Sequence, residues 1–275
     1  MSEHPRPIDQ VRRTLVAGLA ATPVLPATVG VTAAPAPSAQ ANATPADRIV
    51  IFDVNETLLD FEPLAPIFVR IFGDAGALRT WFNQVVLYSE ALTLSGDYAD
   101  AGTVGVAVLR MMAQASGRAV APSDLDDLER LSGTMPTYAD TPKALGALRA
   151  AGYRLVTLSN NPSVAVDAQL AHAGIRSFFD AVHSIDDRVR CYKPARESYA
   201  DLAAALGVAP SDLWLVSCHA FDTLGAAAAG YRTALVLRPE NAPVGLGRAP
   251  DIVAGDLATL ADRIVHADPR ATGAK

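Results

Sequence analysis

Residues 49–57 read IVIFDVNET. The apolar run 49–52 has no polar alternation, which predicts a short strand buried on both faces, as in a parallel sheet. Similar apolar runs lie at residues 155–158, 213–216 and 233–237. We therefore expect an α/β fold built on a doubly wound parallel sheet.

Amphipathic segments separate these runs and are followed by glycine. The predicted helices cover residues 141–151, 163–173, 195–206 and 221–229, and the glycines are Gly152, Gly174, Gly207 and Gly230. Glycine commonly follows a helix because it adopts left-handed backbone angles without steric cost. In sheets of this kind, ligands bind beyond the carboxyl ends of the strands, so the residues that follow the apolar runs form the candidate site.

A long helical stretch interrupts the series of strands. Residues 63–137 contain the helical patterns 77–93, 102–115 and 124–131 and no clear strand run. This stretch is too long for a simple crossover. We expect a helical cap inserted into a core made of residues 48–62 and 138–268, where it covers the strand ends and excludes water.

The first 41 residues have the layout of an export signal. Arg12 and Arg13 precede a stretch without charged residues, 14–46, and Ala39 and Ala41 form an Ala-x-Ala cleavage site. The paired arginines favour the twin-arginine route, with cleavage after Ala41 to leave an exported protein. The alternative is a flexible extension on a cytoplasmic enzyme.

Residues 42–47 are expected to be a linker. Pro23 and Pro26 interrupt the apolar segment that precedes it, which disfavours a membrane span.

Composition excludes several other classes of protein. The net charge is −6, from 23 basic and 29 acidic residues, and no basic block stands out, so nucleic acid is not an expected partner. Two cysteines, Cys191 and Cys218, exclude a disulfide scaffold and a Cys-rich zinc site. The two could pair in an exported protein, but we expect free thiols. The five histidines show no metal-ligand spacing.

Polar side chains follow the predicted strands, namely Asp53, Ser159, Asn160, Ser217, His219 and Asp222. Asp53 is either a covalent nucleophile or the cap of a turn. Ser159 and Asn160 either donate hydrogen bonds to an anionic oxygen or cap the next helix. Asp222 is either a helix N-terminal acid or an acid that positions water or the partner of Asp53.

Lys193 precedes a predicted helix and is one of two lysines between Asp53 and the C-terminal lysine. Placed beside Asp53, its charge would keep the carboxylate ionised. The alternative is a solvated surface lysine.

Four motifs occur in a fixed order at these positions. Residues 52–60 read FDVNETLLD, 158–160 read LSN, 192–194 read YKP and 217–222 read SCHAFD. In this order they resemble the haloacid dehalogenase superfamily, and within it the chain is most similar to the type II (S)-2-haloacid dehalogenases. The resemblance implies a Rossmann-like core with a helical cap inserted after the first strand, in agreement with the long helical stretch.

The resemblance also implies a reaction. Asp53 attacks the carbon that bears the halogen, with inversion, and the resulting ester is cleaved by water at the carboxyl carbon of Asp53. Thr57, Ser159 and Lys193 hold the carboxylate, and Asp222 helps to activate the water.

Further positions match the family as substrate-binding residues. Asn160 and Ser217 contact the substrate or Asp53, and Tyr199 matches a family tyrosine. His219 stands where many members carry Asn. It is either a base or a hydrogen-bonded strand-end histidine.

Asn55, expected among the substrate-binding residues, separates two branches of the superfamily. Phosphatases of the superfamily carry an Asp-x-Asp pattern at this position, and its second Asp protonates the leaving alcohol. Asn has no acidic proton to give, whereas halide leaves without one. We therefore expect no metal or other cofactor, with Mg²⁺ required only if the chain is a phosphatase.

The cap departs from the family pattern. Members carry an arginine there that receives the halide, but this chain reads Thr80-Trp81-Phe82-Asn83-Gln84. The nearest arginine, Arg79, is two or three positions away, roughly 200–300° around a helix. Trp81, Phe82 and Asn83 form a halide pocket from ring edges and an amide donor, or else they belong to the interior of the cap.

Three functions remain open. The first is hydrolytic dehalogenation of short 2-haloalkanoic acids to a 2-hydroxy acid and halide, with the haloacid and water as the only small-molecule partners. The second is a phosphatase of the same superfamily, and the third is an exported binding protein without turnover. Neither nucleic acid nor stable membrane insertion is expected, and a homodimer is compatible with the resemblance.

Overall fold

The computed structural model describes residues 48–268. The predicted export signal (1–41) and linker (42–47) lie outside the described residues. Within residues 48–268, none of the helices combines the length and the apolar character that a membrane crossing needs.

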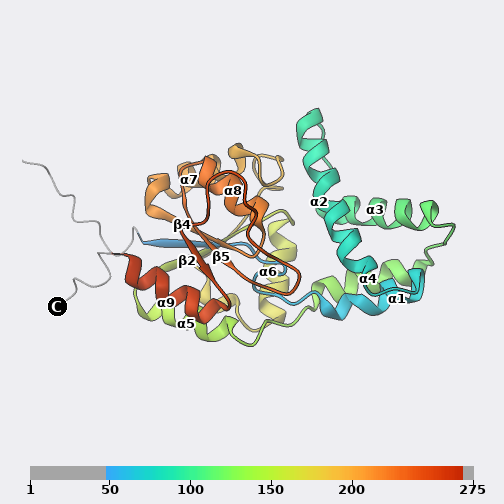
Figure 1. Cartoon of the computed structure of the whole chain (residues 1–275), viewed down its shortest axis with the longest axis horizontal. Coiled ribbons are helices and arrows are strands. Elements are labelled where there is room, and N and C mark those ends of the chain that lie inside the picture. The colour runs from blue at the N-terminus through green and yellow to red at the C-terminus, as the bar shows by residue number, and fades with distance from the viewer. Residues whose placement is uncertain (1–47, 269–275) are drawn as a thin grey trace, which may run out of the picture. The chain divides into compact units, whose positions relative to one another are not determined.

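A parallel sheet with helices on either side forms the centre of the fold (Figure 1). It has six strands in the order β3-β2-β1-β4-β5-β6. The strands are β1 (Ile49–Phe52), β2 (Arg154–Ser159), β3 (Ala181–Ser184), β4 (Leu213–Ser217), β5 (Arg232–Val236) and β6 (Ile252–Ala254). The four predicted strands are confirmed. The two edge strands, β3 and β6, were not predicted because they are short, with only two or three consecutive apolar residues each.

Helices cover both faces of the sheet. The core helices are α5 (Thr141–Ala150), α6 (Ser163–His172), α7 (Arg196–Leu206), α8 (Ala220–Ala228) and α9 (Leu257–Ala267), with short 3-10 turns at Arg176–Phe178 and Pro210–Asp212. Val50 and Phe52 pack with residues of α5, α6 and α9, whereas Ile49 and Ile51 pack with residues of α7 and α8. Alternate side chains of one strand thus bury against opposite layers, which explains the unbroken apolar run.

The insert between β1 and β2 is helical, as predicted. A 3-10 turn at Glu62–Leu64 leads into α1 (Ala65–Phe72), α2 (Ala77–Ser95), α3 (Ala101–Ala115) and α4 (Pro122–Gly133). The chain leaves and re-enters the core through two adjacent segments, because Leu59 bridges Thr137 and the Tyr138 amide donates to the Leu58 carbonyl at 3.1 Å. The chain thus leaves the core near residue 59 and returns to it near residue 138.

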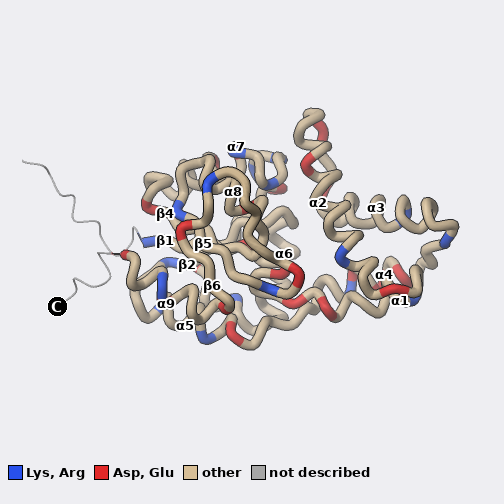
Figure 2. The backbone as a smooth tube through the Cα atoms, viewed as in Figure 1, with Lys and Arg blue, Asp and Glu red and all other residues tan. Residues whose placement is uncertain are grey.

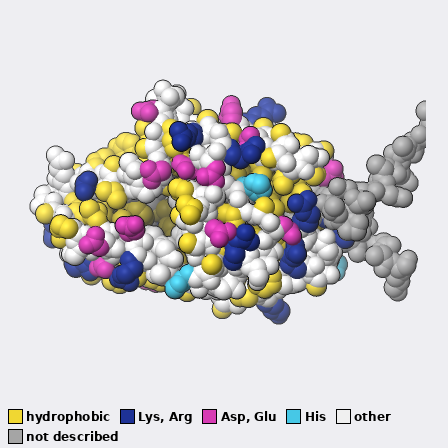
Figure 3. All heavy atoms as spheres, turned by 180° about the vertical axis from the view of Figure 1, so that it is seen from behind, with side chains coloured by type: hydrophobic (Ala, Val, Ile, Leu, Met, Phe, Trp, Pro, Cys, Tyr) yellow, Lys and Arg dark blue, Asp and Glu magenta, His cyan; other side chains and the backbone are white. Residues whose placement is uncertain are grey.

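Charged side chains are dispersed over the described part of the chain. Lys and Arg alternate with Asp and Glu along both cap and core (Figure 2). On the face shown in Figure 3, basic and acidic side chains are likewise interspersed. A nucleic-acid surface needs a basic stripe or patch, which these views do not show for the described residues.

Helix α8 approaches the segment before α7 very closely. A Cβ atom added to Gly225 would lie 2.6 Å from the Pro194 carbonyl oxygen and 2.7 Å from Cε2 of Tyr199. Real Cβ atoms do not come so near to backbone atoms, so only glycine permits this contact. The approach fixes the distance between α8 and Lys193, which precedes Pro194.

We expect Gly225→Ala to force α8 away from this segment, since the clash involves backbone. The cost should be roughly 1–3 kcal/mol in the free energy of unfolding, as for other overpacked interiors. Urea unfolding measures it. Gly146→Ala in α5 is the matched control, because its Cβ would meet only Cε1 of Phe178 at 3.8 Å, an ordinary contact. Equal stability of the two variants would contradict the close-approach account.

Candidate active site

Asp53 lies at the carboxyl end of β1, where parallel strands place functional side chains. Its carboxylate is nearly buried. Oδ1 accepts a hydrogen bond from Nζ of Lys193 at 2.8 Å, and Oδ2 accepts one from Oγ1 of Thr57 at 2.7 Å. Nδ1 of His219 lies 3.3 Å from Oδ2.

Burial alone would raise the pKa of Asp53, but the charge of Lys193 and the contact with His219 hold it well below its usual range. The carboxylate is therefore ionised.

Lys193 is buried, with 2% of its surface exposed. Its ammonium donates to Asp53, to Oδ2 of Asp222 at 2.9 Å and to the Leu158 carbonyl at 3.0 Å, so all three of its protons are used. Burial alone would lower the pKa of Lys193, but the two carboxylates raise it above its ordinary value. The solvated-surface reading of this lysine is wrong.

Asp222, on α8, binds the ammonium of Lys193, and Tyr199, on α7, binds Asp222. The Tyr199 hydroxyl donates to Oδ1 of Asp222 at 2.7 Å, and both residues are completely buried. This corrects the expectation that Tyr199 binds substrate. Its hydroxyl is committed to Asp222 because α7 and α8 pack closely around Gly225.

Three predicted residues brace the loops after the strands. Oγ of Ser159 accepts from the Asn161 amide at 3.1 Å, and Oγ of Ser217 accepts from the His219 amide at 3.1 Å. Oδ1 of Asn160 accepts from the Lys193 amide at 3.1 Å. The oxygens of these side chains fix the loops that carry Lys193 and His219. Among the described residues no hydrogen bond joins Ser159 to Asp53, so its predicted contact with the carboxylate is not observed, whereas contact of Asn160 and Ser217 with substrate remains a prediction.

Thr57 connects two of these loops. Its hydroxyl donates to Asp53 and accepts from the Cys218 amide at 2.9 Å. Cys218 is buried and Cys191 is partly buried, and both are free thiols, as expected.

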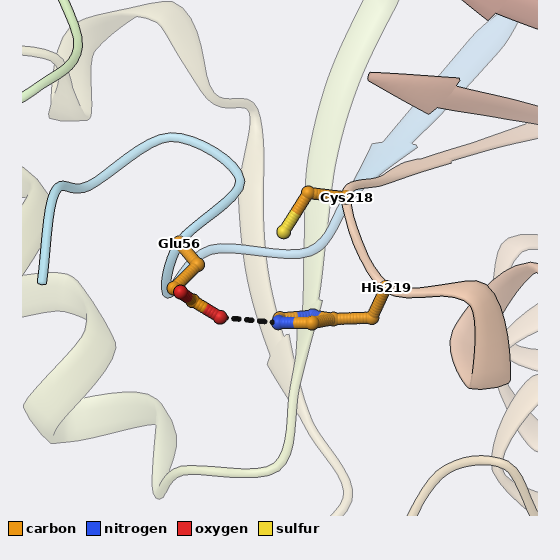
Figure 4. A group of neighbouring side chains, drawn as sticks. All are labelled: Glu56, Cys218 and His219. Atoms are coloured by element: carbon orange, nitrogen blue, oxygen red, sulfur yellow. Dashed lines mark hydrogen bonds and ion pairs between the residues drawn. The ribbon is translucent and has the colours of Figure 1, made fainter. Parts of the chain in front are cut away.

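Glu56 and Arg79 were not predicted as site residues. Nε2 of His219 lies 2.9 Å from Oε2 of Glu56 (Figure 4). The Arg79 guanidinium binds both oxygens of Glu56, with Nη1 to Oε2 at 2.9 Å, and its Nε donates to Glu240 at 2.9 Å. Burial alone would raise the pKa of Glu56, but His219 and Arg79 lower it. The sequence hinted at this pair only through the position of Glu56, an acid that follows Asn55 in the loop after β1.

The cap contributes one face of α2 to the site. Arg79 and Phe82 are three residues apart and therefore lie on the same side of the helix. The Phe82 ring stacks on His219 with a centroid distance of 5.3 Å. Arg79 thus faces the core, but its charge is paired with Glu56 rather than left for a halide.

Trp81 does not belong to the site, which corrects the prediction that it lines a halide pocket. Its indole nitrogen donates to the Gly105 carbonyl at 2.8 Å, and its ring packs on Phe68 inside the cap. One residue along a helix is a rotation of about 100°, so Trp81 and Phe82 point in different directions.

Asn55 has a buried Oδ1 without a hydrogen-bond partner among the described residues. A buried acceptor of this kind requires a partner, which a bound substrate or water would supply. This fits the expectation that Asn55 lies among the substrate-binding residues.

The donor set does not suit Mg²⁺. Ligand atoms of Glu56, Cys218 and His219 lie within 4.8 Å of one another. However, Glu56 is already neutralised by Arg79 and bonded to His219, and sulfur and nitrogen are poor ligands for Mg²⁺. The carboxylates of Asp53 and Asp222 share Lys193 instead.

A pocket of about 390 Å³ opens between cap and core beside this cluster. It is lined by Glu56, Arg79 and Phe82 together with Tyr138 and Glu240. Asp53 and His219 do not line it, so the pocket lies on the Glu56 side of His219, away from the nucleophile.

Removing Lys193 tests the electrostatic arrangement. Lys193→Met leaves two buried carboxylates without their shared cation, which should cost about 3–5 kcal/mol at neutral pH. Loss of the cation raises the pKa of Asp53 in the folded protein. Over part of the acid range, Asp53 is therefore protonated and neutral in the folded variant but ionised in the folded wild type. The destabilisation should therefore be larger at about pH 7 than at about pH 4.

Urea unfolding at the two pH values measures this difference. Lys143→Met is the control, because Lys143 is exposed on α5 and should change stability at neither pH. A cost for Lys193→Met that is independent of pH would contradict the arrangement.

Comparison with known proteins agrees with this geometry. The sequence model of the haloacid dehalogenase-like hydrolases matches residues 48–230. The (S)-2-haloacid dehalogenase of Xanthobacter autotrophicus is 31% identical over 215 residues, which cover 78% of this chain and 82% of that protein.

The solved structures are similar as well. The L-2-haloacid dehalogenase of Xanthobacter autotrophicus superposes with a TM-score of 0.72 at 28% identity, covering 80% of this chain and 98% of that one. A second structure of that enzyme, with chloropropionic acid covalently bound, gives the same values. By fold, motif order and sequence, the chain belongs to the haloacid dehalogenase-like hydrolases.

Proposed function

We infer that this chain hydrolyses the carbon–halogen bond of short (S)-2-haloalkanoic acids through an ester on Asp53, and so releases halide and a 2-hydroxy acid. The observation that carries this function is the ionised, buried Asp53 held between Lys193, Thr57 and His219. A carboxylate that is desolvated and fixed in this way is a nucleophile without a hydration shell to displace.

In the first step, an oxygen of Asp53 attacks the carbon that bears the halogen. The new C–O bond forms as the carbon–halogen bond breaks, and halide leaves with the electron pair, which inverts the carbon. No proton moves. The charge of Lys193 holds the carboxylate in its anionic form until it reacts.

In the second step, water attacks the carboxyl carbon of Asp53. Negative charge develops on the carboxyl oxygen, and Nζ of Lys193, 2.8 Å from Oδ1, stabilises it. The bond between the carboxyl carbon and the ester oxygen then breaks, and the 2-hydroxy acid leaves with an oxygen that came from Asp53.

Asn55 and Lys193 disfavour the phosphatase alternative. An alkoxide leaving a phosphate ester needs a proton, which the amide of Asn55 cannot supply. The two carboxylates that could hold Mg²⁺ are bound to Lys193. We propose turnover without a metal. The binding-protein alternative is disfavoured because the nucleophile and its partners are all in place.

Halide release from (S)-2-chloropropionate in the presence of EDTA tests the function. The wild type should release halide, and Asp53→Asn should lower the rate by ~10³-fold or more, as removal of other nucleophiles does. Asp126→Asn, an exposed acid of α4, is the control and should keep wild-type activity. Halide release by Asp53→Asn, or Mg²⁺-dependent hydrolysis of phosphate esters by the wild type, would contradict the assignment.

We also propose that residues 1–41 direct export by the twin-arginine route and are removed after Ala41. The support is the arginine pair, the uncharged stretch and the Ala-x-Ala site. Residues 1–41 fused to a reporter that folds in the cytoplasm should send it out of the cytoplasm, shortened by the signal. Replacing Arg12 and Arg13 with Lys should abolish export. A fusion that stays inside at full length would refute the signal.

A further inference from the structure

His219 is held in one orientation between two carboxylates. Nδ1 lies 3.3 Å from Oδ2 of Asp53, and Nε2 lies 2.9 Å from Oε2 of Glu56. The ring stacks on Phe82 at 5.3 Å and on Phe221 at 5.1 Å. A ring fixed by both nitrogens and by two aromatic neighbours has little rotational freedom, and Nδ1 faces the carboxyl group of Asp53.

Asp222, the other candidate base, is not free to accept a proton from water. Its side chain is completely buried. Oδ2 accepts from Lys193 at 2.9 Å, and Oδ1 accepts from Tyr199 at 2.7 Å. Because the side chain has no exposed surface, a water molecule could reach this carboxylate only if neighbouring groups moved. Asp222 therefore fits the role of a counter-ion for Lys193.

We propose that His219 is the base that deprotonates the hydrolytic water in the second step, with Glu56 and Arg79 as its positioning residues. This inference rests on the proposed dehalogenation. Glu56 accepts the proton on Nε2, which fixes the tautomer whose Nδ1 lone pair faces the ester carbon. A carboxylate orients the histidine base of the serine hydrolases in the same way.

The charge of His219 changes during the cycle. Burial alone would lower the pKa of His219, but Cys218, Asp53 and Glu56 raise it well above its ordinary value, so the resting ring is an imidazolium. Alkylation removes the charge of Asp53, while Lys193 keeps its own. The pKa of His219 then falls and the ring loses its proton to solvent. This is the one proton that the overall hydrolysis releases.

Neutral His219 takes a proton from the attacking water at Nδ1. The imidazolium gives this proton to the alkoxide oxygen that leaves as the hydroxyl of the product. The regenerated carboxyl group of Asp53, whose pKa is low, passes the second water proton to His219. The resting ion pair is thereby restored.

Glu56 and Arg79 carry signs of a functional constraint. Glu56 has a left-handed backbone (φ 60°), which costs a residue with a side chain about 1 kcal/mol or more, and it is almost completely buried. Such a conformation persists where surrounding contacts hold it, and here the contacts come from His219 and from Arg79 of the cap. The base is therefore complete only when α2 is seated on the core.

Rapid quenching followed by intact-protein mass measurement separates the two steps. With (S)-2-chloropropionate, His219→Asn should release about one halide per site in a burst and accumulate the Asp53 ester. Later turnover should be ~10²–10⁴-fold slower than in the wild type, the usual contribution of a general base. His172→Asn, an exposed histidine of α6, is the control and should show wild-type kinetics.

Two other outcomes of this experiment would overturn the role of His219, and a third would overturn the proposed function on which it rests. Wild-type turnover by His219→Asn without an ester would overturn the role of His219. Loss of halide release without an ester would also overturn it, because His219 would then act in the first step. If the wild type itself released no halide, the proposed dehalogenation would fail, and this inference with it.

Arg79→Gln tests the positioning role through pH. Removing the cation beside Glu56 should raise the pKa of His219 further, so ester hydrolysis should reach its maximum at a higher pH than in the wild type. The variant should be slow near neutral pH and recover in alkali, while Arg79→Lys restores the profile in part. An equal loss of rate at every pH would indicate a merely structural role.

Discussion

The buried ammonium of Lys193 is shared by Asp53 and Asp222, and much of the molecule serves to keep it there. Burying a charge is very unfavourable unless partners compensate it, so the two carboxylates and the Leu158 carbonyl must all meet the ammonium together. This brings β1, β2 and α8 to one point. The need for Gly225 follows from the same constraint, because any side chain there would separate α8 from the lysine.

Acidic and basic side chains are also present in equal number in the cluster that runs from Asp53 toward the cap. The net charge of the resting cluster is close to zero, because three acids are matched by three cations. The acids are Asp53, Glu56 and Asp222, and the cations are Lys193, His219 and Arg79. Alkylation of Asp53 removes one negative charge and leaves an excess of positive charge around the ester. That excess lowers the affinity of His219 for its proton, and Lys193, which keeps its charge, remains to stabilise the oxyanion formed when water attacks. The same change thus prepares both the electrophile and the base.

Much of the core could be predicted from the sequence, because buried parallel strands leave unbroken apolar runs and helix ends leave glycine. Strands β3 and β6 could not, since short edge strands bury too little to produce such a run. In the site, Asp53, Thr57, Lys193 and Asp222 were accessible through motif order. Glu56 and Arg79 were not, because their pairing depends on how α2 sits on the core. Trp81 and Phe82 are adjacent in sequence, and only packing decided which of them faces His219.

The central claim is that Asp53, and not water, attacks the substrate carbon. A single turnover with enzyme in excess over (S)-2-chloropropionate in H₂¹⁸O tests it most directly. The account predicts a first 2-hydroxy acid product without ¹⁸O and one labelled oxygen in the carboxylate of Asp53. Label in the product of the first turnover, with none in Asp53, would show direct attack by water and contradict the account.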